Sequence, residues 1–366
     1  MNSSGKTSLL VFSLLLAAKG LAALEIGVDT QWAGDMVVSE EIAVAPRATL
    51  KIMPASRIVF KGGGAIVCDG KLSAEDALFL ADPGLSPGIS ILGHGQMEFS
   101  YCVFKDFVNG GSRYNVFMRT LKGKMSIKGC RLENCAAVEF LYSAGTVAGC
   151  LFKDSVGVAL HLYHADNSKV GGSTFWGGPR TSCLLQLYAS DRCATTNCHL
   201  YGALTGLSLG FGSKGNLFNA LNIHEPIIGV SLQGREVRGN LFQRLTVSRC
   251  KSTAVRLDSA GDGNCFVNCA IYGSGVYAVN AIGAEATSFV GSVFMGNKNL
   301  LCSKPADLPF FRRNMLWQNG ADGEALKLLN ARSGDNVIAD PMSSAPDNAV
   351  SMPQAGDGKI TIEPPK

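Results

Sequence analysis

The densest group of side chains that could do chemistry is the run His161-Leu162-Tyr163-His164, with Asp166 close behind it. Apolar and polar residues alternate here, so we expect a strand with His161 facing outward, Leu162 facing inward, and Tyr163 and His164 at its end. A histidine removes a proton near neutral pH and a tyrosine can supply one, so the pair could act as base and acid. The simpler interpretation is a set of exposed side chains at a turn.

An internal repeat indicates which elements hold these residues. Gly215-Asn216-Leu217-Phe218 recurs as Gly239-Asn240-Leu241-Phe242 and Gly263-Asn264-Cys265-Phe266, with 24 residues between copies. Each unit carries short alternating segments separated by Gly, Asn or Ser, which is a strand period inside a longer repeat. A short strand cannot bury one face alone, but stacking the units would form a continuous core. A β-sandwich is the alternative, and it would not repeat the motif at a fixed interval.

With these repeats, the chain resembles the right-handed parallel β-helix proteins of the pectate-lyase-like superfamily, over roughly residues 30–340. The opening segments Trp32-Ala33-Gly34-Asp35-Met36-Val37-Val38 and Ile58-Val59-Phe60-Lys61-Gly62 look like its first coils, and Asn336-Val337-Ile338-Ala339-Asp340-Pro341 resembles a segment found after its last coil. The resemblance implies an all-β, right-handed parallel β-helix of about nine to eleven coils with a short C-terminal cap and tail. It also implies an asparagine ladder at Asn216, Asn240 and Asn264. Phe218, Phe242 and Phe266 should form a buried stack, with Phe152 and Phe175 as earlier members.

The resemblance also implies a substrate groove along one outer sheet, so outward residues on successive coils matter most. Our alignment gives two outward columns: Glu139, Ala159, Leu184, Ser208, Ser231, Arg256, Asn280 and Leu141, His161, Gln186, Gly210, Gln233, Asp258, Ile282. We take His161, Tyr163 and Arg256 as candidate catalytic residues. Candidate substrate-binding residues are Glu139, Gln186, Gln233 and Asp258, because amides suit sugar hydroxyls and an Arg fork suits a uronate carboxylate. Two alternatives stay open. A solvent-exposed strand face carries polar residues without any function, and an error of one residue in our alignment would exchange the inward and outward faces.

Composition bounds the class of protein and the range of partners. The 366 residues are 46% hydrophobic and 17% charged, with a net charge of +4. This charge is too small for the strongly basic face that nucleic-acid binding needs. Residues 1–23 have a positive start at Lys6, an apolar run from Ser8 to Ala18 and small residues at Gly20 and Ala22, which predicts a secretory signal peptide. Residues 24–340 should form the β-helix, and 341–366 a Pro/Ser/Gly-rich tail. No later stretch is apolar enough to span a bilayer.

Metal and cofactor motifs are missing from the sequence. The 12 cysteines include spacings such as Cys130-x4-Cys135 that do not match a paired zinc site, so buried thiols, with one or two disulfides, are the expected state. Cys130, Cys150, Ser173 and Cys198 should occupy one column. There is no Gly-rich nucleotide loop, and calcium stays open without assignable ligands.

These observations favour an exported periplasmic, cell-surface or extracellular protein that meets a polysaccharide along an outer sheet. Catalysis stays open at this point, with lyase action on a uronate-containing glycan ahead of hydrolysis. The turn Gly93-His94-Gly95 lacks the upstream Asp pair of the galacturonan hydrolases. The alternative is a non-catalytic surface adhesin or a structural envelope module. The sequence leaves the oligomeric state open.

Overall fold

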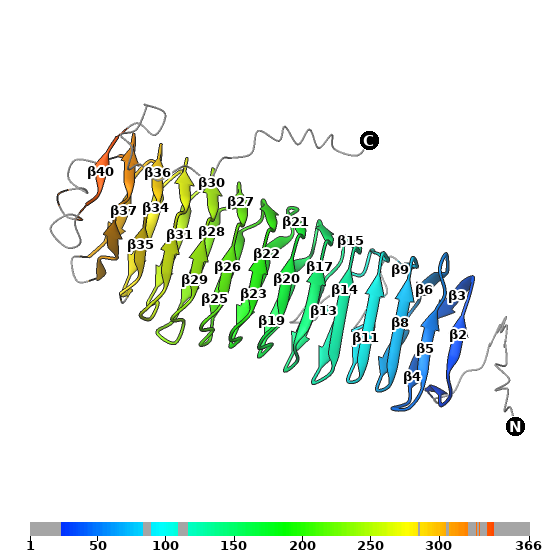
Figure 1. Ribbon diagram of the computed structural model, residues 1–366. Coiled ribbons are helices and arrows are strands. Elements are labelled where there is room, and N and C mark those ends of the chain that lie inside the picture. The colour runs from blue at the N-terminus through cyan, green and yellow to red at the C-terminus, as the bar shows by residue number, and fades with distance from the viewer. Residues whose placement is uncertain are drawn as a thin grey trace, which may run out of the picture.

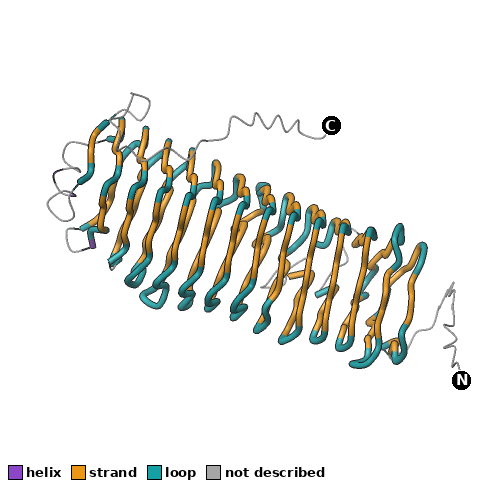
Figure 2. The backbone as a smooth tube through the Cα atoms, viewed as in Figure 1, coloured by secondary structure: helices purple, strands orange, loops and turns teal. Residues whose placement is uncertain are grey.

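The computed structural model describes residues 23–82, 89–108, 116–284, 286–304, 307–320, 327, 329 and 335–339. The predicted signal peptide, apart from Ala23, and the predicted tail lie outside these residues. Within them the chain winds through three parallel sheets, one strand of each per coil, and forms a long straight stack (Figure 1). The smooth backbone trace shows the same repeated strand-and-turn unit along the molecule (Figure 2).

Each sheet takes every third strand of the chain. Sheet A consists of β1 (Leu24–Ile26), β4 (Glu41–Val44), β7 (Ala65–Cys68), β10 (Ile91–Gly93), β13 (Val116–Leu121), β16 (Ala137–Leu141), β19 (Gly157–Tyr163), β22 (Thr181–Tyr188), β25 (Thr205–Gly210), β28 (Ile228–Gln233), β31 (Thr253–Asp258), β34 (Tyr277–Ile282) and β37 (Leu301–Ser303). Sheet B consists of β2 (Thr30–Trp32), β5 (Thr49–Ile52), β8 (Lys71–Glu75), β11 (Gln96–Ser100), β14 (Lys124–Lys128), β17 (Gly145–Ala148), β20 (Lys169–Gly171), β23 (Ala194–Thr196), β26 (Leu217–Asn219), β29 (Leu241–Gln243), β32 (Cys265–Val267), β35 (Ser288–Val290) and β38 (Phe310–Arg312). Sheet C consists of β3 (Asp35–Val38), β6 (Arg57–Phe60), β9 (Leu78–Ala81), β12 (Val103–Lys105), β15 (Arg131–Glu133), β18 (Leu151–Lys153), β21 (Thr174–Trp176), β24 (His199–Tyr201), β27 (Asn222–His224), β30 (Thr246–Ser248), β33 (Ala270–Tyr272), β36 (Val293–Met295), β39 (Met315–Trp317) and β40 (Val337–Ile338).

The expected parallel β-helix is confirmed. Sheets A and B have 13 strands each and sheet C has 14, so the stack is slightly longer than the expected nine to eleven coils. The Gly-Asn-x-Phe motif marks only the coils of β26, β29 and β32, so the sequence gives no exact count of the others.

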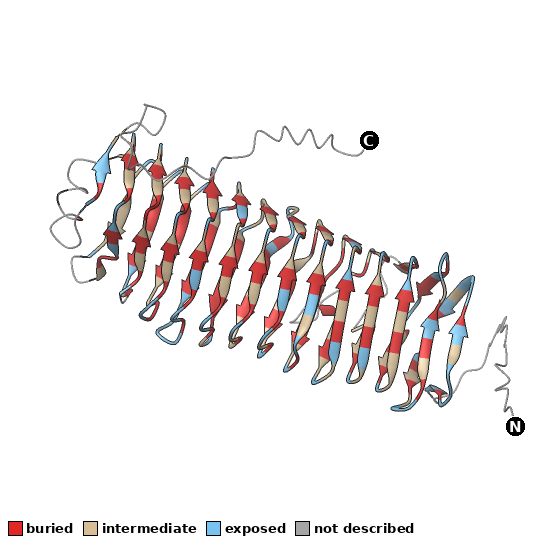
Figure 3. Ribbon diagram, viewed as in Figure 1, coloured by how far each residue is buried: buried red, intermediate tan, exposed pale blue. Residues whose placement is uncertain are grey.

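The core consists of inward side chains stacked from coil to coil. Buried and partly exposed residues alternate along the strands, as the banded colouring shows (Figure 3). Phe218, Phe242 and Phe266 form the predicted aromatic stack in sheet B, with ring centroids 4.9 and 4.3 Å apart. Phe152 and Phe175 do not belong to that stack. They stack on each other at 4.6 Å in sheet C, because their short strands occupy a different wall of the coil.

Polar side chains hold the corners between the sheets. The predicted ladder is present: the Asn216 Nδ2 donates to Asn240 Oδ1 at 2.9 Å, and the Asn240 Nδ2 donates to Asn264 Oδ1 at 2.9 Å. Two further asparagine pairs, which sequence reasoning missed, occupy other corners: Asn297 with Asn319 and Asn314 with Asn336. These amides satisfy backbone groups that the turns would otherwise leave buried and unpaired.

The cysteines also fall into the predicted column. The backbone N–H of Cys102 donates to Cys130 Sγ at 3.4 Å, and that of Cys150 donates to Ser173 Oγ at 3.1 Å. All twelve cysteines lie in the described residues and none of them forms a disulfide, which confirms the buried-thiol interpretation.

Candidate functional site

The outer face of sheet A carries a continuous column of polar side chains. The strand register aligns one outward residue from each of eight consecutive strands, β13 to β34: Arg119, Glu139, His161, Gln186, Ser208, Ser231, Arg256 and Asn280. Because neighbouring strands lie about 4.8 Å apart, each side chain can touch the next one along the stack.

This register corrects part of the predicted alignment. Ala159 and Leu184 were expected beside Glu139, but both are 1% exposed and belong to the interior. His161 and Gln186, expected in the second column, instead follow Glu139 directly, so Glu139 and His161 occupy adjacent coils. The cause is the spacing between β16 and β19: Val138 pairs with Leu160, 22 residues later, and not with Val158 as expected.

Three of these side chains form a buried charged relay. His161 Nδ1 lies 2.9 Å from Glu139 Oε1, and the Arg119 guanidinium donates from Nε to Glu139 Oε2. The side chains are 17%, 5% and 20% exposed for His161, Glu139 and Arg119. Burial alone would raise the pKa of Glu139, but the hydrogen bond from His161 and the positive charge of Arg119 outweigh it and lower that pKa below its usual value. Glu139 is therefore a carboxylate at neutral pH.

The carboxylate of Glu139 determines what His161 can do. An ionised carboxylate only accepts, so Nδ1 of His161 donates in this contact, and in the neutral ring Nε2 is the nitrogen with the lone pair. Nε2 is buried and has no hydrogen-bond partner within the described part of the chain. The ring of His161 lies 5.7 Å from that of Tyr163 on the same strand and 5.6 Å from that of Tyr188 on the next. A histidine ring oriented by a carboxylate and flanked by two tyrosine rings has the arrangement of a general base.

Aromatic side chains line the carboxyl ends of the same strands. Tyr142 stacks on His164 at 4.7 Å, Tyr163 and His164 lie at 4.8 Å, and Tyr188 meets Phe211 edge-on at 4.8 Å. We call Tyr142, Tyr163, His164, Tyr188 and Phe211 the aromatic rim. Phe211 is 72% exposed although it is large and apolar. Such rings present flat apolar surface at the edge of a polar face, which suits the apolar faces of sugar rings.

The other predicted site residues lie farther along sheet A. Arg256 Nη2 donates to Asp258 Oδ2 at 3.1 Å, and Gln233 Nε2 donates to Ser231 Oγ at 3.0 Å. Arg256 is four strands beyond His161 in the column, a separation of about 19 Å. The structure thus brings Glu139, His161, Tyr163 and Gln186 together, but it does not bring Arg256, Asp258 or Gln233 to them. Arg256 is too far away to act on the same bond as His161.

Sequence reasoning missed Arg119 and three members of the aromatic rim, Tyr142, Tyr188 and Phe211. A signal for Arg119 exists, because Met118-Arg119-Thr120 repeats the apolar-charged alternation of Val138-Glu139-Phe140 twenty residues earlier. Tyr188 could not be placed until the register of β22 was known.

Metal ligands do not gather at this site. Among the residues that the structure describes, no three His, Cys, Asp or Glu side chains lie close enough to hold a metal ion. The same residues contain no helix that is long and apolar enough to cross a membrane.

Comparison with known proteins identifies chains with a similar fold. The family model described as "Right handed beta helix region" matches residues 85–242. No curated protein sequence gives a significant match. Among solved structures, the chain is similar to the periplasmic alginate epimerase AlgG (12% identity, TM-score 0.69, 76% of this chain and 77% of that one). It is also similar to a mannuronic acid specific polysaccharide family 6 lyase enzyme from human gut microbiota (13% identity, TM-score 0.51, 88% of this chain and 87% of that one). At these identities the likeness concerns the fold, and with the sheet topology it establishes that the chain is a right-handed parallel β-helix protein.

Proposed function

We propose that this protein is exported, binds a uronate-containing polysaccharide on the outer face of sheet A, and removes the proton next to the uronate carboxylate. The observation that carries the proposal is His161, which Glu139 orients through Nδ1 and whose ring lies 5.7 and 5.6 Å from the rings of Tyr163 and Tyr188. Histidine is the side chain that most often serves as a positioned base.

The proposed chemistry uses groups of this chain alone. Nε2 of His161 takes the proton from the sugar carbon that bears the carboxylate. In a lyase reaction the electron pair then forms a carbon–carbon double bond while the glycosidic C–O bond breaks, and the phenol of Tyr163 gives its proton to the leaving oxygen. The imidazolium that forms on His161 is stabilised by the buried carboxylate of Glu139, 2.9 Å away.

Neighbouring residues suit the rest of an acidic sugar chain. Arg119 keeps guanidinium N–H groups that do not face Glu139, and the Gln186 amide stands next to His161 in the column. The aromatic rim borders these groups. Farther along, Arg256 would bind a second carboxylate as a distal binding residue instead of a catalytic one, with Asp258 and Gln233 beside it.

The printed names of two structural neighbours agree with this substrate class. One is an alginate epimerase and the other is a mannuronic acid specific lyase, so both names refer to uronate polysaccharides. This supports an acidic glycan as the first class of substrate to test. It does not decide between elimination and epimerisation, which begin with the same proton removal.

The proposed export depends on residues 1–23, which have the character of a signal peptide. The first strand, β1, begins at Leu24, directly after the segment with signal-peptide character. Expression of the full chain in a bacterial host with a periplasm, followed by N-terminal sequencing, would check this. A mature chain that starts near Leu24 is expected, and retention of Met1 in the cytoplasm would contradict it.

A non-catalytic adhesin or envelope module is the second candidate, and one observation favours it. Nε2 of His161 is buried, so the relay could serve only to stabilise three coils of sheet A. In that case the outer face would bind a glycan without changing it.

An activity screen separates the two candidates. The mature chain is incubated with acidic and neutral polysaccharides, with calcium or with chelator, and unsaturated-uronate absorbance and new reducing ends are followed. We expect absorbance on a uronate polymer and a loss of at least about a hundredfold in His161→Ala. The matched control is His94→Ala, because His94 also pairs with a carboxylate (Nδ1 to Asp69 Oδ1, 2.7 Å) but lies on an exposed turn. Reducing ends without absorbance would indicate hydrolysis, and retained binding without either signal would indicate the module.

A further inference from the structure

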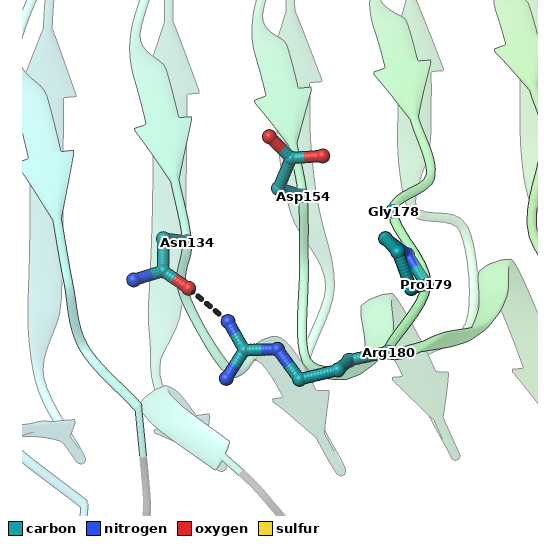
Figure 4. A pocket seen from close by; sticks show the side chains of 5 residues that line it. All are labelled: Asn134, Asp154, Gly178, Pro179 and Arg180. Carbon is teal, nitrogen blue, oxygen red and sulfur yellow. Dashed lines mark hydrogen bonds between the residues drawn. The ribbon is translucent and has the colours of Figure 1, made fainter.

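A hollow lies at the corner between sheets C and A, on the coils that carry the relay. It is lined by Asn134, Asp154, Gly178, Pro179 and Arg180 and has a volume of about 340 Å³ (Figure 4). Its polar members Asn134, Asp154 and Arg180 precede β16, β19 and β22, whose outward residues include Glu139, His161 and Gln186. The volume is at the lower end of the range for small-molecule sites, which fits a single sugar ring.

Hydrogen bonds fix the walls of this hollow. The Asn134 Nδ2 donates to Asp106 Oδ1 at 2.6 Å, and Arg180 donates from Nη2 to Asn134 Oδ1, as the dashed line in Figure 4 shows. Both ends of the Asn134 amide are therefore occupied, and its orientation is set. Arg180 reaches back across two coils to make this contact.

The loop that carries Arg180 is also held in place. The buried hydroxyl of Thr181 donates to Ser155 O at 2.6 Å and accepts from the backbone N–H of Gly178 at 3.0 Å. A Cβ at Gly178 would stand 2.7 Å from Asp154 Oδ1, too close for a real contact. Glycine at this position thus leaves the Asp154 carboxylate open to the hollow.

Two groups at the hollow are left with spare hydrogen-bonding capacity. Within the described ranges, the Asp154 side chain has no hydrogen bond or ion pair, and Arg180 uses one N–H of its guanidinium for Asn134. A carboxylate accepts and a guanidinium donates, so a ligand must offer both donors and acceptors. The hydroxyls of a sugar ring do both.

The charge of the hollow selects among sugars. Among the lining residues Asp154 brings one negative charge and Arg180 one positive charge, so the lining has no net positive charge to attract an anion. A uronate carboxylate would be repelled by Asp154, whereas an uncharged ring would not. We infer that the hollow is a subsite for a neutral sugar residue of the glycan that sheet A binds. This inference rests on the proposed function, and it makes the substrate a mixed polysaccharide with both uronate and neutral residues.

The position of the hollow agrees with a separate sugar from the one that reacts. His161 comes seven residues after Asp154 on the same coil, which limits their Cα separation to about 23 Å. The hollow is therefore within reach of a glycan chain whose uronate lies at His161.

Binding measurements on three oligosaccharide sets test the inference: all-uronate, all-neutral hexose and alternating uronate–hexose. For the mature chain we expect tightest binding of the alternating set and detectable binding of the neutral set. Asp154→Ala and Arg180→Ala should each weaken binding of the alternating set by about tenfold and leave all-uronate binding unchanged. Arg244→Ala is the matched control, because Arg244 makes a similar exposed bond to Asn219 Oδ1 at 3.1 Å on another wall of the coil. Thermal midpoints would confirm that each variant is folded.

The outcomes separate this inference from the proposed function. Absence of neutral-sugar binding, or an equal loss of all-uronate binding in Asp154→Ala and Arg180→Ala, would overturn the neutral subsite even if His161 proves catalytic. Conversely, neutral-sugar binding that depends on Asp154 would support the subsite even if no polymer is cleaved or altered.

Discussion

At the scale of single residues, the central feature is the buried carboxylate of Glu139 between two basic side chains, Arg119 and His161. Glu139 would be costly to bury alone, and it remains ionised because Arg119 and His161 both face it. Removing either partner leaves an uncompensated group. The relay therefore links the stability of three neighbouring coils to the protonation of one residue.

This residue predicts a specific dependence of stability on pH. The pKa of Glu139 is lower in the folded chain than its ordinary value of 4.5, so ionised Glu139 favours folding above that value. The contribution is lost as the pH falls through the lower, folded pKa. We expect Glu139→Gln to be less stable than the native chain at pH 7 by about 2 kcal/mol, and the difference should shrink below pH 4.5.

Thermal midpoints at several pH values between 3 and 7 would measure this difference. A gap between the native chain and Glu139→Gln that stays constant over the whole range would contradict the account of the relay.

Residue types at the site were predictable from the sequence, but their neighbours were not. Alternation in β19 correctly placed His161 outward and Leu162 in the core. Val138 pairs with Leu160 instead of Val158, and this shift of two residues keeps the face but changes the partner. Glu139 and His161 therefore lie directly opposite each other on adjacent strands, and Arg256 lies about 19 Å from His161.

At the scale of elements, corner side chains connect the coils. Each ladder amide bonds to the coil before it and the coil after it: the backbone N–H and the Nδ2 of Asn216 both donate to Asn240 Oδ1, at 3.0 and 2.9 Å. The Asn240 Nδ2 also donates to Ser213 O at 3.1 Å. Three coils depend on this one buried amide.

We expect Asn240→Ala to destabilise the β-helix by about 2–3 kcal/mol, because it removes the acceptor of the buried Asn216 backbone N–H and the donor that Asn240 Nδ2 offers to Ser213 O. Asn222→Ala is the control, since Asn222 is exposed and its side chain bonds to the partly exposed His199 at 3.3 Å. Thermal unfolding midpoints of the two variants would measure the difference, and we expect the lower midpoint for Asn240→Ala. Equal midpoints for the two variants would show that the ladder does not stabilise the stack.

The sequence predicted this ladder because its motif repeats at a fixed interval. The pairs Asn297–Asn319 and Asn314–Asn336 were not predicted, since they recur at 22 residues and without a shared motif. Phe152 and Phe175 were assigned to the wrong stack for a related reason. A repeat gives the spacing between coils but not the wall of the coil on which a residue lies.

At the scale of the whole molecule, the long core isolates most of the cysteines from solvent. Ten of the twelve are buried, and Cys265 and Cys302 are partly exposed. Burial raises the pKa of the Cys183, Cys250 and Cys269 thiols to about 12, so these groups stay protonated and unreactive at neutral pH.

A thiol titration with a coloured disulfide reagent checks this arrangement. In the native protein we expect at most two thiols, Cys265 and Cys302, to react at pH 8 within minutes, and all twelve to react in denaturant. Many fast-reacting thiols in the native state, or fewer than twelve in denaturant without reductant, would contradict a stack of buried free thiols.

The stack also determines how sites can be arranged over the molecule. Sheet A brings the relay, the aromatic rim and the corner hollow to one set of coils around β16, β19 and β22, and it places Arg256 about 19 Å farther along. Length and fold followed from the repeats in the sequence. The grouping of these features depended on exact strand register, which side-chain patterns alone do not determine.

Proton removal by His161 is tested most directly by isotope exchange. The mature chain is incubated with uronate-containing oligosaccharides in D₂O, and NMR follows the carbon next to the carboxylate. The account predicts deuterium at that carbon or an unsaturated product, unchanged in His94→Ala and absent in His161→Ala. Bound oligosaccharide that keeps its original hydrogen, or exchange that persists in His161→Ala, would contradict it.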